Sequence, residues 1–389
     1  MIHLSSRIFL AIALLGCISS SLYYFLCLWS AHVFLRAAME NPGVNGLQHR
    51  QPVSILKPLK GVDPEIYESF RSHCTQDYPE YEIIFGVSDP HDPAVATVER
   101  LKKEFPGLAI SLVVCREILG PNVKVSNLQQ MAETARYELL LVNDSDIRVE
   151  DDYLRRVTAP LVDERVGMVT CLYRGVAASS LGSRLEALGI ATDFCAGVLA
   201  ASQLERGLHF GLGSTLAFRR QDLEKIGGFR NLVDYLADDY ELGRRISGLD
   251  RQVVLSGVVV ETYLPAYDFR GFVQHQLRWF RGVRDARMGG YVGLVATFGI
   301  MWALIAFLAA GFAPWTWLLL AVVLLRFILA IVMCRCVLHD QAVLKSLWLL
   351  PLRDLIAVGV WMASFAGHTV TWRGDTFRLK AGRLTRLAP

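Results

Sequence analysis

The sequence predicts an α/β domain built on an open sheet, with transmembrane helices at the N-terminus and in the C-terminal region. Two observations support this prediction. Of the 389 residues, 53% are hydrophobic and 20% are charged, and the mean hydropathy is +0.34. This is too apolar for an ordinary soluble enzyme, so a globular domain joined to membrane spans is expected. In the polar block 36–287, short apolar runs alternate with helical patterns.

Four apolar runs in this block predict strands, and the patterns between them predict helices. In the first helix, Asp63 is the expected cap and Pro64 the first residue. Continuous apolar strands that alternate with helices are typical of a sheet covered on both faces, and ligands bind such sheets at the carboxyl ends of the strands. The predicted strands are 53–58, 81–87, 109–114 and 137–142, and the predicted helices are 63–74, 94–105 and 126–136.

Charge-free stretches predict four membrane spans. The first stretch contains 28 residues, which is long for a signal peptide and favours a retained anchor. A second stretch, 288–325, predicts a helical hairpin that turns at Pro314. The last apolar stretch is just long enough to span. The predicted spans are 8–35, 291–312, 315–334 and 355–372.

Basic residues at both ends of the polar block predict that it is cytoplasmic, by the positive-inside rule. They are Arg36 at one end and Arg278, Arg281, Arg284 and Arg287 at the other. The C-terminal tail is also basic, yet four spans would place it on the opposite side. Either the last segment is re-entrant or the rule fails for the tail. The predicted organisation is an anchor (1–36), a catalytic domain (50–265), an interfacial amphipathic helix region (266–290), about three transmembrane helices (291–372) and a basic tail (373–389).

The composition also excludes several classes of function. A net charge of +3 is too small to indicate a nucleic-acid partner. The eight cysteines include no CxxC pair and no zinc-type His/Cys spacing, so reduced thiols are expected. The first strand is followed by the lone Gly61, not by GxGxxG, and no GxxxxGK[ST] loop occurs, so neither a dinucleotide fold nor a P-loop is predicted.

Acidic residues follow the second and fourth predicted strands at the ligand edge of the sheet. Asp89 and Asp92 follow "YEIIFGV", and Asp144 and Asp146 follow "YELLLV". Two carboxylates in a D-x-D turn can approach one hard divalent cation, which also accepts diphosphate oxygens as ligands. The alternative is an Asx turn with solvated charges, and Asp89 beside Pro90 can equally be a turn former.

A second acidic pair precedes a predicted helix in "YLADDYELGRRI". Asp238 and Asp239 either cap this helix or include a general base that must stay ionised near a cation. Upstream, "GLGSTLAFRR" offers a loop of small residues that can lie against a flat ligand.

The stretch "FRGFVQHQLRWFRGVRDARMGG" places His275, Arg278 and Trp279 on one face of a helix. Arginine suits phosphate oxygens because its guanidinium donates two hydrogen bonds at once, and tryptophan supplies a flat wall for a sugar or a lipid head. The alternative is an interfacial helix whose arginines extend into lipid headgroups.

Taken together, these motifs resemble a membrane-bound inverting glycosyltransferase of the GT-A type. More narrowly, "VSILKPLKGVDPE", "GPNVKVSNL", "NDSDIRV", "LADDYELG" and "HQLRW" resemble the ceramide glucosyltransferase family. The stretch from Asp144 to Gly175 is most similar to the bacterial branch of that family associated with hopanoid biosynthesis. The resemblance covers about Pro52 to Trp279, and the spans outside it are placed similarly.

The resemblance implies a role for each matching residue. Asp89 would contact the uracil of a UDP-sugar, with Asp92 as the other candidate, and Lys124 and Asn127 would lie near the nucleotide. Asp239, preceded by Asp238, would be the catalytic base. His275 stands where the family motif has Gln, so its role does not carry over directly. Asp144 and Asp146 would hold Mg²⁺ or Mn²⁺ against the diphosphate, and Arg278 and Trp279 would complete the Q-x-x-R-W-type element.

The predicted function is therefore transfer of a sugar from UDP-GlcNAc or UDP-glucose to a hydroxyl of a membrane lipid, either a hopanoid such as bacteriohopanetetrol or ceramide. The expected partners are the donor, the lipid acceptor and the bilayer, with no obligate protein partner. The alternatives are a non-catalytic sugar-nucleotide sensor, a transporter, or a processive polysaccharide synthase. Arg326, inside the third predicted span, is either functional or extends to a headgroup.

Overall fold

The computed structural model describes residues 2–40, 51–310, 312–372 and 374–387, which form two compact units. Arg373 of the predicted tail lies outside the described residues. The stretch 179–200, within the range predicted for the catalytic domain, belongs to unit 1. Unit 1 comprises Met1–Leu35, Ser179–Ala200 and Ala266–Ala381; unit 2 comprises Arg36–Ala178, Ala201–Pro265 and Gly382–Pro389.

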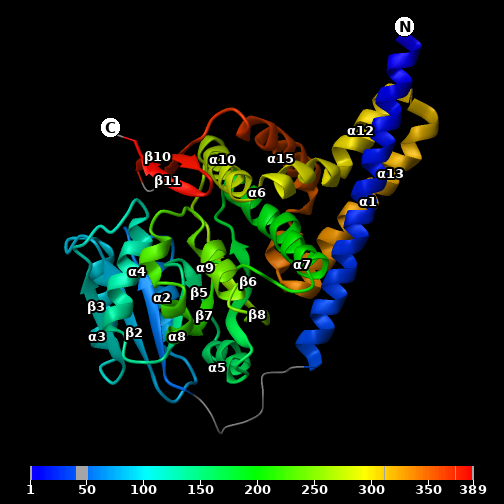
Figure 1. Cartoon of the computed structure of the whole chain (residues 1–389). Coiled ribbons are helices and arrows are strands. Elements are labelled where there is room, and N and C mark those ends of the chain that lie inside the picture. Colours follow the sequence, from blue (N-terminus) through cyan, green and yellow to red (C-terminus); the bar gives the residue numbers. More distant parts are fainter. Residues whose placement is uncertain (1, 41–50, 311, 373, 388–389) are drawn as a thin grey trace. The chain divides into compact units, whose positions relative to one another are not determined.

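Eight strands form one mixed sheet in unit 2, in the order β3-β2-β1-β4-β7-β6-β8-β5 (Figure 1). Strands β1 to β4 are mutually parallel, whereas β7 is antiparallel to β4 and to β6. The first three predicted strands are confirmed with the same bounds, and the fourth begins two residues later. The strands are β1 (Val53–Pro58), β2 (Tyr81–Val87), β3 (Ala109–Val114), β4 (Leu139–Val142), β5 (Ile147–Arg148), β6 (Val166–Val176), β7 (Leu216–Arg219) and β8 (Gln252–Tyr263).

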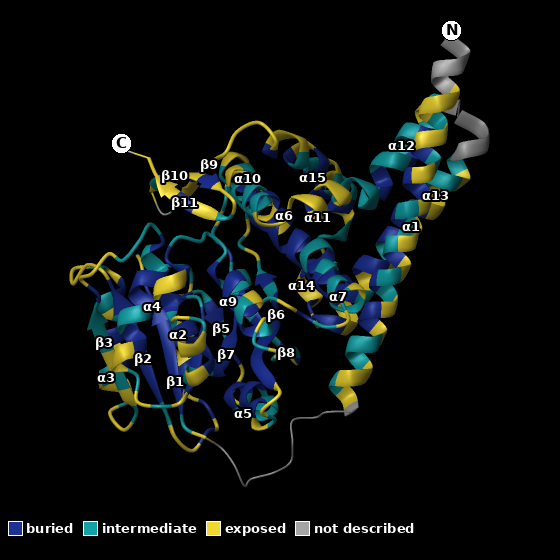
Figure 2. Ribbon diagram, viewed as in Figure 1, coloured by how far each residue is buried: buried dark blue, intermediate teal, exposed yellow. Residues whose placement is uncertain are grey.

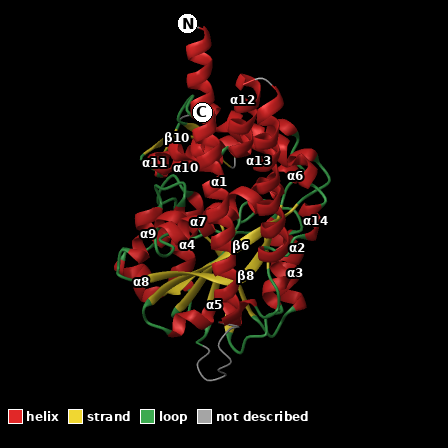
Figure 3. Ribbon diagram, turned by 90° about the vertical axis from the view of Figure 1, so that its right-hand side faces the viewer, coloured by secondary structure: helices red, strands yellow, loops and turns green. Residues whose placement is uncertain are grey.

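Helices cover both faces of this sheet, as the sequence predicts. The chain steps in one direction from β1 to β3 and then back past β1 to β4, so right-handed crossovers put α2 and α3 on one face and α4 on the other. Figure 3 shows this arrangement, with α9 on the side of α4. The helices of unit 2 are α2 (Ile66–Cys74), α3 (Ala94–Glu104), α4 (Val123–Thr134), α5 (Tyr153–Thr158), η1 (Ala159–Val162), α8 (Arg220–Lys225), η3 (Phe229–Leu232) and α9 (Asp238–Ser247).

The cap predicted for the first of these helices is wrong. The residue before α2 is Glu65, in the left-handed region at φ 53°, and it makes no side-chain cap. Asp63 instead accepts a hydrogen bond of 2.5 Å from the hydroxyl of Ser145 in the turn after β4. Its carboxylate therefore joins two loops at the ligand edge.

The core of unit 2 lies on the central strands. Every residue of β1 and of β4 is buried, and Figure 2 shows β1 in dark blue. Burying one Ile or Leu side chain contributes roughly 1.5–3 kcal/mol, so the apolar runs read in the sequence also supply the main drive for sheet formation. Lys57 is the only charged residue of these two strands, and it is buried with them.

Unit 1 consists mainly of helices with apolar surfaces. On α1, Phe9, Leu15 and Trp29 are exposed, as expected for a helix that contacts lipid (Figure 2). The elements of unit 1 are α1 (Ile2–Glu40), α6 (Leu181–Gly189), η2 (Ile190–Phe194), α7 (Cys195–Leu204), α10 (Phe269–Ala286), α11 (Met288–Gly293), η4 (Leu294–Thr297), α12 (Gly299–Ala310), α13 (Phe312–Val332), η5 (Met333–Val337), α14 (Gln341–Leu344), η6 (Leu347–Leu349), α15 (Leu350–Ser364), β9 (Thr369–Trp372) and β10 (Asp375–Lys380).

Four helices among the described residues are long and apolar enough to cross a membrane, and a bent pair is a fifth candidate. The bent pair turns by 50° near Phe298. Pro314 lies in the first turn of α13, where proline is tolerated, so the predicted turn at this residue is wrong. The last span ends at Ser364, and the end of the predicted stretch 355–372 is strand β9. The candidates are Arg7–Met39, Leu181–Leu204, Thr316–Val337 and Leu347–Ser364, plus the pair Met288–Thr297 and Gly299–Ala309.

The C-terminal tail includes β11 (Arg383–Arg386), which is hydrogen-bonded to the loop before α9. The backbone N–H of Leu236 donates to the carbonyl of Gly382 at 3.2 Å, and the N–H of Leu384 donates to Asp234 at 2.6 Å. These residues all belong to unit 2. This end of the tail is therefore part of the same compact unit as the eight-stranded sheet, whereas β10 belongs to unit 1.

Candidate active site

Three segments far apart in the sequence meet at the carboxyl end of β4. Because β7 runs antiparallel to β4, with Val142 opposite Leu216, the loop before β7 lies beside the turn that follows β4. The N–H of Asp144 donates to the carbonyl of Gly213 at 3.3 Å. The first turn of α9 is the third segment and contributes Asp238 and Asp239. Sequence reasoning named these aspartates, and the structure shows that they share one site.

Lys124 of α4 bridges the acidic residues of this site. Its Nζ lies 2.8 Å from Asp144 Oδ1 and 3.1 Å from Asp238 Oδ2. Burial opposes the charge on Lys124, but Asp144, Asp238 and Asp239 outweigh it and raise the pKa of the ammonium group. Lys124 therefore stays protonated and ties the turn after β4 to the start of α9.

Asp239 is held by backbone donors rather than by side chains. Its Oδ2 accepts the N–H of Gly213 at 2.7 Å, and its Oδ1 accepts the N–H of Tyr240 at 2.7 Å. Burial, followed by the charge of Asp238, raises the pKa of Asp239 to about 6. A carboxylate with a pKa near the working pH can accept a proton effectively. The cap alternative is wrong for this pair, because no side chain caps α9.

The close approach of other groups favours glycine at Gly213 and requires it at Gly243. A Cβ on Gly213 would lie 2.8 Å from Asp144 Oδ2 and 3.2 Å from Asp239 Oδ2. A Cβ on Gly243 would lie 2.2 Å from the backbone nitrogen of Gly211, so α9 can pack directly on the glycine loop. The loop predicted to lie against a ligand thus also positions two carboxylates.

The turn after β4 has donor groups that fit a divalent cation. Asp146 is buried, and its Oδ2 accepts the hydroxyl of Thr262 at 2.6 Å. Burial, followed by the negative charge of Asp144, raises the pKa of Asp146 to about 6. A cation between two such carboxylates would relieve this repulsion. Within the described ranges no three His, Cys, Asp or Glu residues surround one point, so a cation held by Asp144 and Asp146 would need further ligands from the substrate or water.

Lys57 is a site residue that sequence reasoning missed. It is buried in β1, and its Nζ donates to the backbone carbonyl of Asp144 at 3.1 Å. Burial lowers the pKa of Lys57 to about 7, against the opposing effects of Asp146 and Asp144. Behind it, His73 lies 3.2 Å from the side chain of Asn143. A lone lysine within the apolar run "VSILKP" was the available signal.

The two candidates for uracil contact have different surroundings. Asp92 accepts the N–H of Gly61 at 2.9 Å and that of Ala94 at 2.9 Å, so it joins two loops. The side chain of Asp89 is 68% exposed and accepts the N–H of nearby His91 at 2.8 Å. Asn127 is buried, and its side-chain oxygen accepts the hydroxyl of Ser88 at 2.9 Å, next to Asp89.

His275, Arg278 and Trp279 lie on α10, in unit 1, as the helical spacing predicts. The rings of His275 and Trp279 are 5.8 Å apart, and His275 stacks on Tyr267 at 5.2 Å. Beneath them, Glu186 Oε1 lies 3.4 Å from His275 Nδ1. Arg278 is half-buried. The motif face is thus built within unit 1, whereas the acidic site is built within unit 2.

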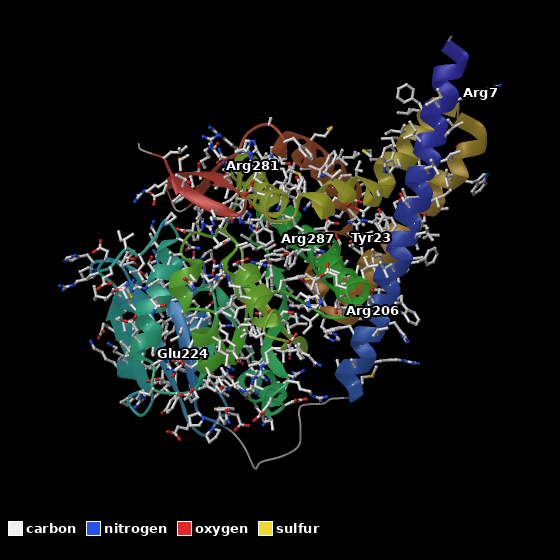
Figure 4. All side chains as sticks on the ribbon, viewed as in Figure 1. Arg7, Tyr23, Arg206, Glu224, Arg281 and Arg287 are labelled. Carbon is white, nitrogen blue, oxygen red and sulfur yellow. The ribbon has the colours of Figure 1, made fainter. Side chains whose placement is uncertain are left out.

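Two of the arginines on α10 do not extend into headgroups, so that alternative is wrong for them. Arg284 is buried and donates to the carbonyls of Ser364 and, at 3.0 Å, of Gly367. Arg281, labelled in Figure 4, donates to Thr369 at 2.7 Å and to Ala366 at 2.9 Å. Carbonyls at the end of a helix lack intrahelical partners and carry partial negative charge, which explains this use of arginine after α15.

The mixed eight-stranded sheet covered by helices is a fold of the GT-A type. The chain resembles the solved structure of the mannosyltransferase PcManGT from Pyrobaculum calidifontis in complex with GDP-Man and Mn²⁺. The TM-score is 0.54 over 91% of this chain and 97% of that one, at 19% identity, so this likeness concerns the fold. The profile of glycosyl transferase family 21 matches residues 12–385, and the chain belongs to that family.

Curated relatives confirm the resemblance to the ceramide glucosyltransferase family. Ceramide glucosyltransferase 3 of Caenorhabditis elegans is 27% identical over 230 residues, 59% of this chain and 50% of the relative. Ceramide glucosyltransferase 1 of the same organism is 25% identical over 253 residues, 64% and 53% of the two chains. Ceramide glucosyltransferase of Komagataella phaffii is 33% identical over 108 residues, which are 27% of this chain and 21% of the relative. The chain thus spans about half the length of the C. elegans relatives it matches.

Proposed function

We propose that this glycosyltransferase moves a sugar from a UDP-sugar to a hydroxyl of a membrane lipid, with inversion at the anomeric carbon. The observation that carries the proposal is the site at the sheet's carboxyl edge, where Lys124 joins Asp144 to Asp238 and Gly213 separates Asp144 from Asp239. This places a D-x-D turn beside a buried carboxylate whose pKa suits a base. A sensor that only binds a nucleotide does not need the buried carboxylate of Asp239.

In this mechanism Asp239 takes the proton of the lipid hydroxyl. The hydroxyl oxygen forms a bond to the anomeric carbon while the bond from that carbon to the diphosphate oxygen breaks, and UDP leaves with the electron pair. Hydrogen bonds from the backbone N–H groups of Gly213 and Tyr240 hold the Asp239 carboxylate in one orientation. A fixed base of this kind typically contributes about 10²–10⁴-fold in rate.

Asp144 and Asp146 would hold Mg²⁺ or Mn²⁺, and the bound ion would neutralise charge on the diphosphate. Lys124 supplies a further positive charge beside Asp144 and stays protonated there. Asp89, which is exposed at the end of β2, is the better candidate for the uracil because Asp92 already holds two backbone N–H groups. Arg278 would donate to the diphosphate, and Trp279 with His275 would face the donor or acceptor.

The tail supports a revised membrane topology. Because 382–386 and the sheet belong to one compact unit, both lie on the same side of any membrane. On this proposal the chain would cross an even number of times between Pro265 and Gly382, and one of the three C-terminal candidates would be re-entrant or interfacial. The helix Leu181–Leu204 leaves and rejoins unit 2, so it also returns to its starting side. Positive residues on that side support a cytoplasmic location.

The test uses the full-length protein in detergent with UDP-GlcNAc or UDP-glucose, Mn²⁺ or EDTA, and a membrane lipid extract. We expect metal-dependent release of UDP and a lipid product whose mass has increased by one hexose or one N-acetylhexosamine. Asp239→Asn should still bind the donor but lose turnover. Donor binding without release would support a sensor, and a ladder of products on a gel would support a polysaccharide synthase.

The same experiment identifies the lipid acceptor and the transferred sugar. Ceramide as acceptor and glucose as donor would match the names of the curated relatives, whereas a polyhydroxylated hopanoid and N-acetylglucosamine would match the bacterial branch. Mass spectrometry of the product separates these pairs directly.

A further inference from the structure

Two arginines, Arg326 of α13 and Arg353 of α15, are buried among the apolar helices of unit 1. They are 2% and 3% exposed, and they face Asp193 of η2 and Asp354 of α15. An arginine in such surroundings is costly unless each of its donors is met. The two arginines differ sharply in this respect.

Every nitrogen of the Arg326 guanidinium has a partner. Nε donates to Asp354 at 2.9 Å, Nη1 donates to the carbonyl of Thr192 at 3.1 Å, and Nη2 donates to Asp193 at 2.5 Å. This closed cluster explains why Arg326 does not extend to a headgroup, so that alternative is wrong. Arg326 joins α13 to η2 and α15.

Arg353 has only one satisfied nitrogen within the described part of the chain. Its Nη2 donates to Gln276 at 3.0 Å, whereas Nε and Nη1 are buried without a hydrogen-bond partner. Gly189 makes room for this guanidinium, because a Cβ there would lie 2.4 Å from Nη2 and 2.7 Å from Nε. Buried donors in folded proteins are nearly always paired, so unmet donors on Arg353 indicate a missing acceptor.

Asp193 offers the complementary group. Its side chain is 39% exposed. Its Oδ2 is 3.6 Å from Arg353 Nη2, the nitrogen that donates to Gln276, and this is beyond hydrogen-bond distance. It lies in the π-helix Ile190–Phe194, and such bulges are frequent at functional sites. The next residue, Phe194, packs edge-on against Trp279 at 5.6 Å. A partly exposed carboxylate thus lies beside a guanidinium group with two unmet nitrogens, next to the aromatic face of the motif helix.

We propose that Arg353 and Asp193 bind a hydroxyl group in the neutral headgroup of a membrane lipid. A hydroxyl accepts a hydrogen bond from Arg353 and donates one to Asp193, so it satisfies both groups at once. The two arginines are balanced by Asp193 and Asp354, and Glu186 adds a further negative charge through Gln276. A phosphate would therefore meet uncompensated negative charge. This inference names residues that bind the lipid acceptor, and it rests on the proposed function.

The test measures lipid binding separately from turnover. Full-length protein is placed in phosphatidylcholine nanodiscs alone, or with ceramide, bacteriohopanetetrol or phosphatidic acid, and its thermal midpoint is measured. We expect a hydroxylated lipid to raise the midpoint of the wild type. Asp193→Asn, which keeps the side-chain size, and Gly189→Ala, which keeps every charge but displaces Arg353, should lose most of that rise. Arg335→Met, at an exposed arginine in η5, should keep it.

In the transfer assay, the two test variants should raise KM for the lipid about tenfold or more while KM for the donor stays within twofold, because one charge-assisted hydrogen bond is lost. The inference is overturned if neither hydroxylated lipid stabilises the wild type, if both variants keep the full rise, or if phosphatidic acid stabilises best and loses its effect in the variants. Failure of the proposed function would show instead as no UDP release from the wild type, whatever the lipid does to the midpoint.

Discussion

Replacing Gly213 by alanine tests the geometry of the acidic site most directly. The added Cβ would lie 2.8 Å from Asp144 Oδ2 and 3.2 Å from Asp239 Oδ2, whereas ordinary contact begins near 3.4 Å. Asp144 must therefore move by about 0.6 Å, and Asp239 by about 0.2 Å, unless the loop shifts. Gly213 is not among the described glycines with positive φ, so alanine introduces no backbone strain and the N–H bonded to Asp239 remains.

A misplacement of 1 Å in an active site can cost about 10²-fold in rate. The expected shift of Asp144, the proposed cation ligand, is about half that size, so kcat should fall roughly tenfold, with the thermal midpoint little changed. The assay is UDP release at saturating donor and lipid, together with donor binding. Gly107→Ala is the matched control, because a Cβ there meets nothing within 4 Å. If Gly213→Ala keeps kcat within twofold of wild type, the carboxylates do not need their observed positions and the argument for the site fails.

Four further predictions follow from individual contacts. The pKa of Asp239 is raised to about 6 and a base must be ionised, so kcat should fall about tenfold per pH unit below 6 and level off above it. Lys57→Met removes the donor to the carbonyl of Asp144 and should raise the Mn²⁺ concentration needed for half-maximal rate about 10–100-fold. Arg284→Met leaves two carbonyls after α15 unpaired and should destabilise the protein by about 1.5–3 kcal/mol in thermal or denaturant unfolding. In a Cys336→Ser background, cysteines at 224 and 385 should react together with an impermeant maleimide in sealed vesicles of one orientation, because both lie in unit 2.

Each of these predictions has its own control. For the pH profile, Asp239→Asn should lack the acidic limb, and an unchanged limb would assign it to another group. Lys103→Met, at an exposed lysine of α3, should leave the metal requirement unchanged; an equal effect of both lysine variants would contradict the role of Lys57. Arg270→Met, at an exposed arginine of α10, should be neutral in unfolding. Labelling of only one cysteine would place the tail across the membrane from the sheet.

Much of the fold could be predicted from local pattern. The strands 53–58, 81–87 and 109–114 have their predicted bounds because each is a continuous apolar run that parallel pairing buries on both faces. The hairpin turn predicted at Pro314 is wrong, because proline is tolerated in the first turn of a helix as well as in a loop and the sequence pattern does not distinguish the two. Residues 369–372 form a strand although their apolar run continues that of α15, since hydropathy alone does not distinguish the two.

The side chains of the site were identifiable one by one, but their partners were not. An acidic turn after an apolar strand and a pair of aspartates before a helix are local signals. Lys124 was named from the resemblance, whereas its contacts with Asp144 and Asp238 depend on packing between α4, the turn after β4 and α9. The sequence left the headgroup alternative open for Arg281 and Arg284, because an amphipathic basic helix has the same pattern whether it meets headgroups or the end of another helix.

The sequence by itself determined which segments are apolar enough to be buried or to meet lipid, and which residues can carry charge at strand and helix ends, because both depend on local composition and spacing. The tertiary structure decided which of those charges meet. Because β7 is antiparallel to β4, the loop before β7 places Gly213 between Asp144 and Asp239. Hydrogen bonds join residues 382–384 to the loop before α9. Such contacts join residues tens to hundreds of positions apart, and no local pattern encodes them.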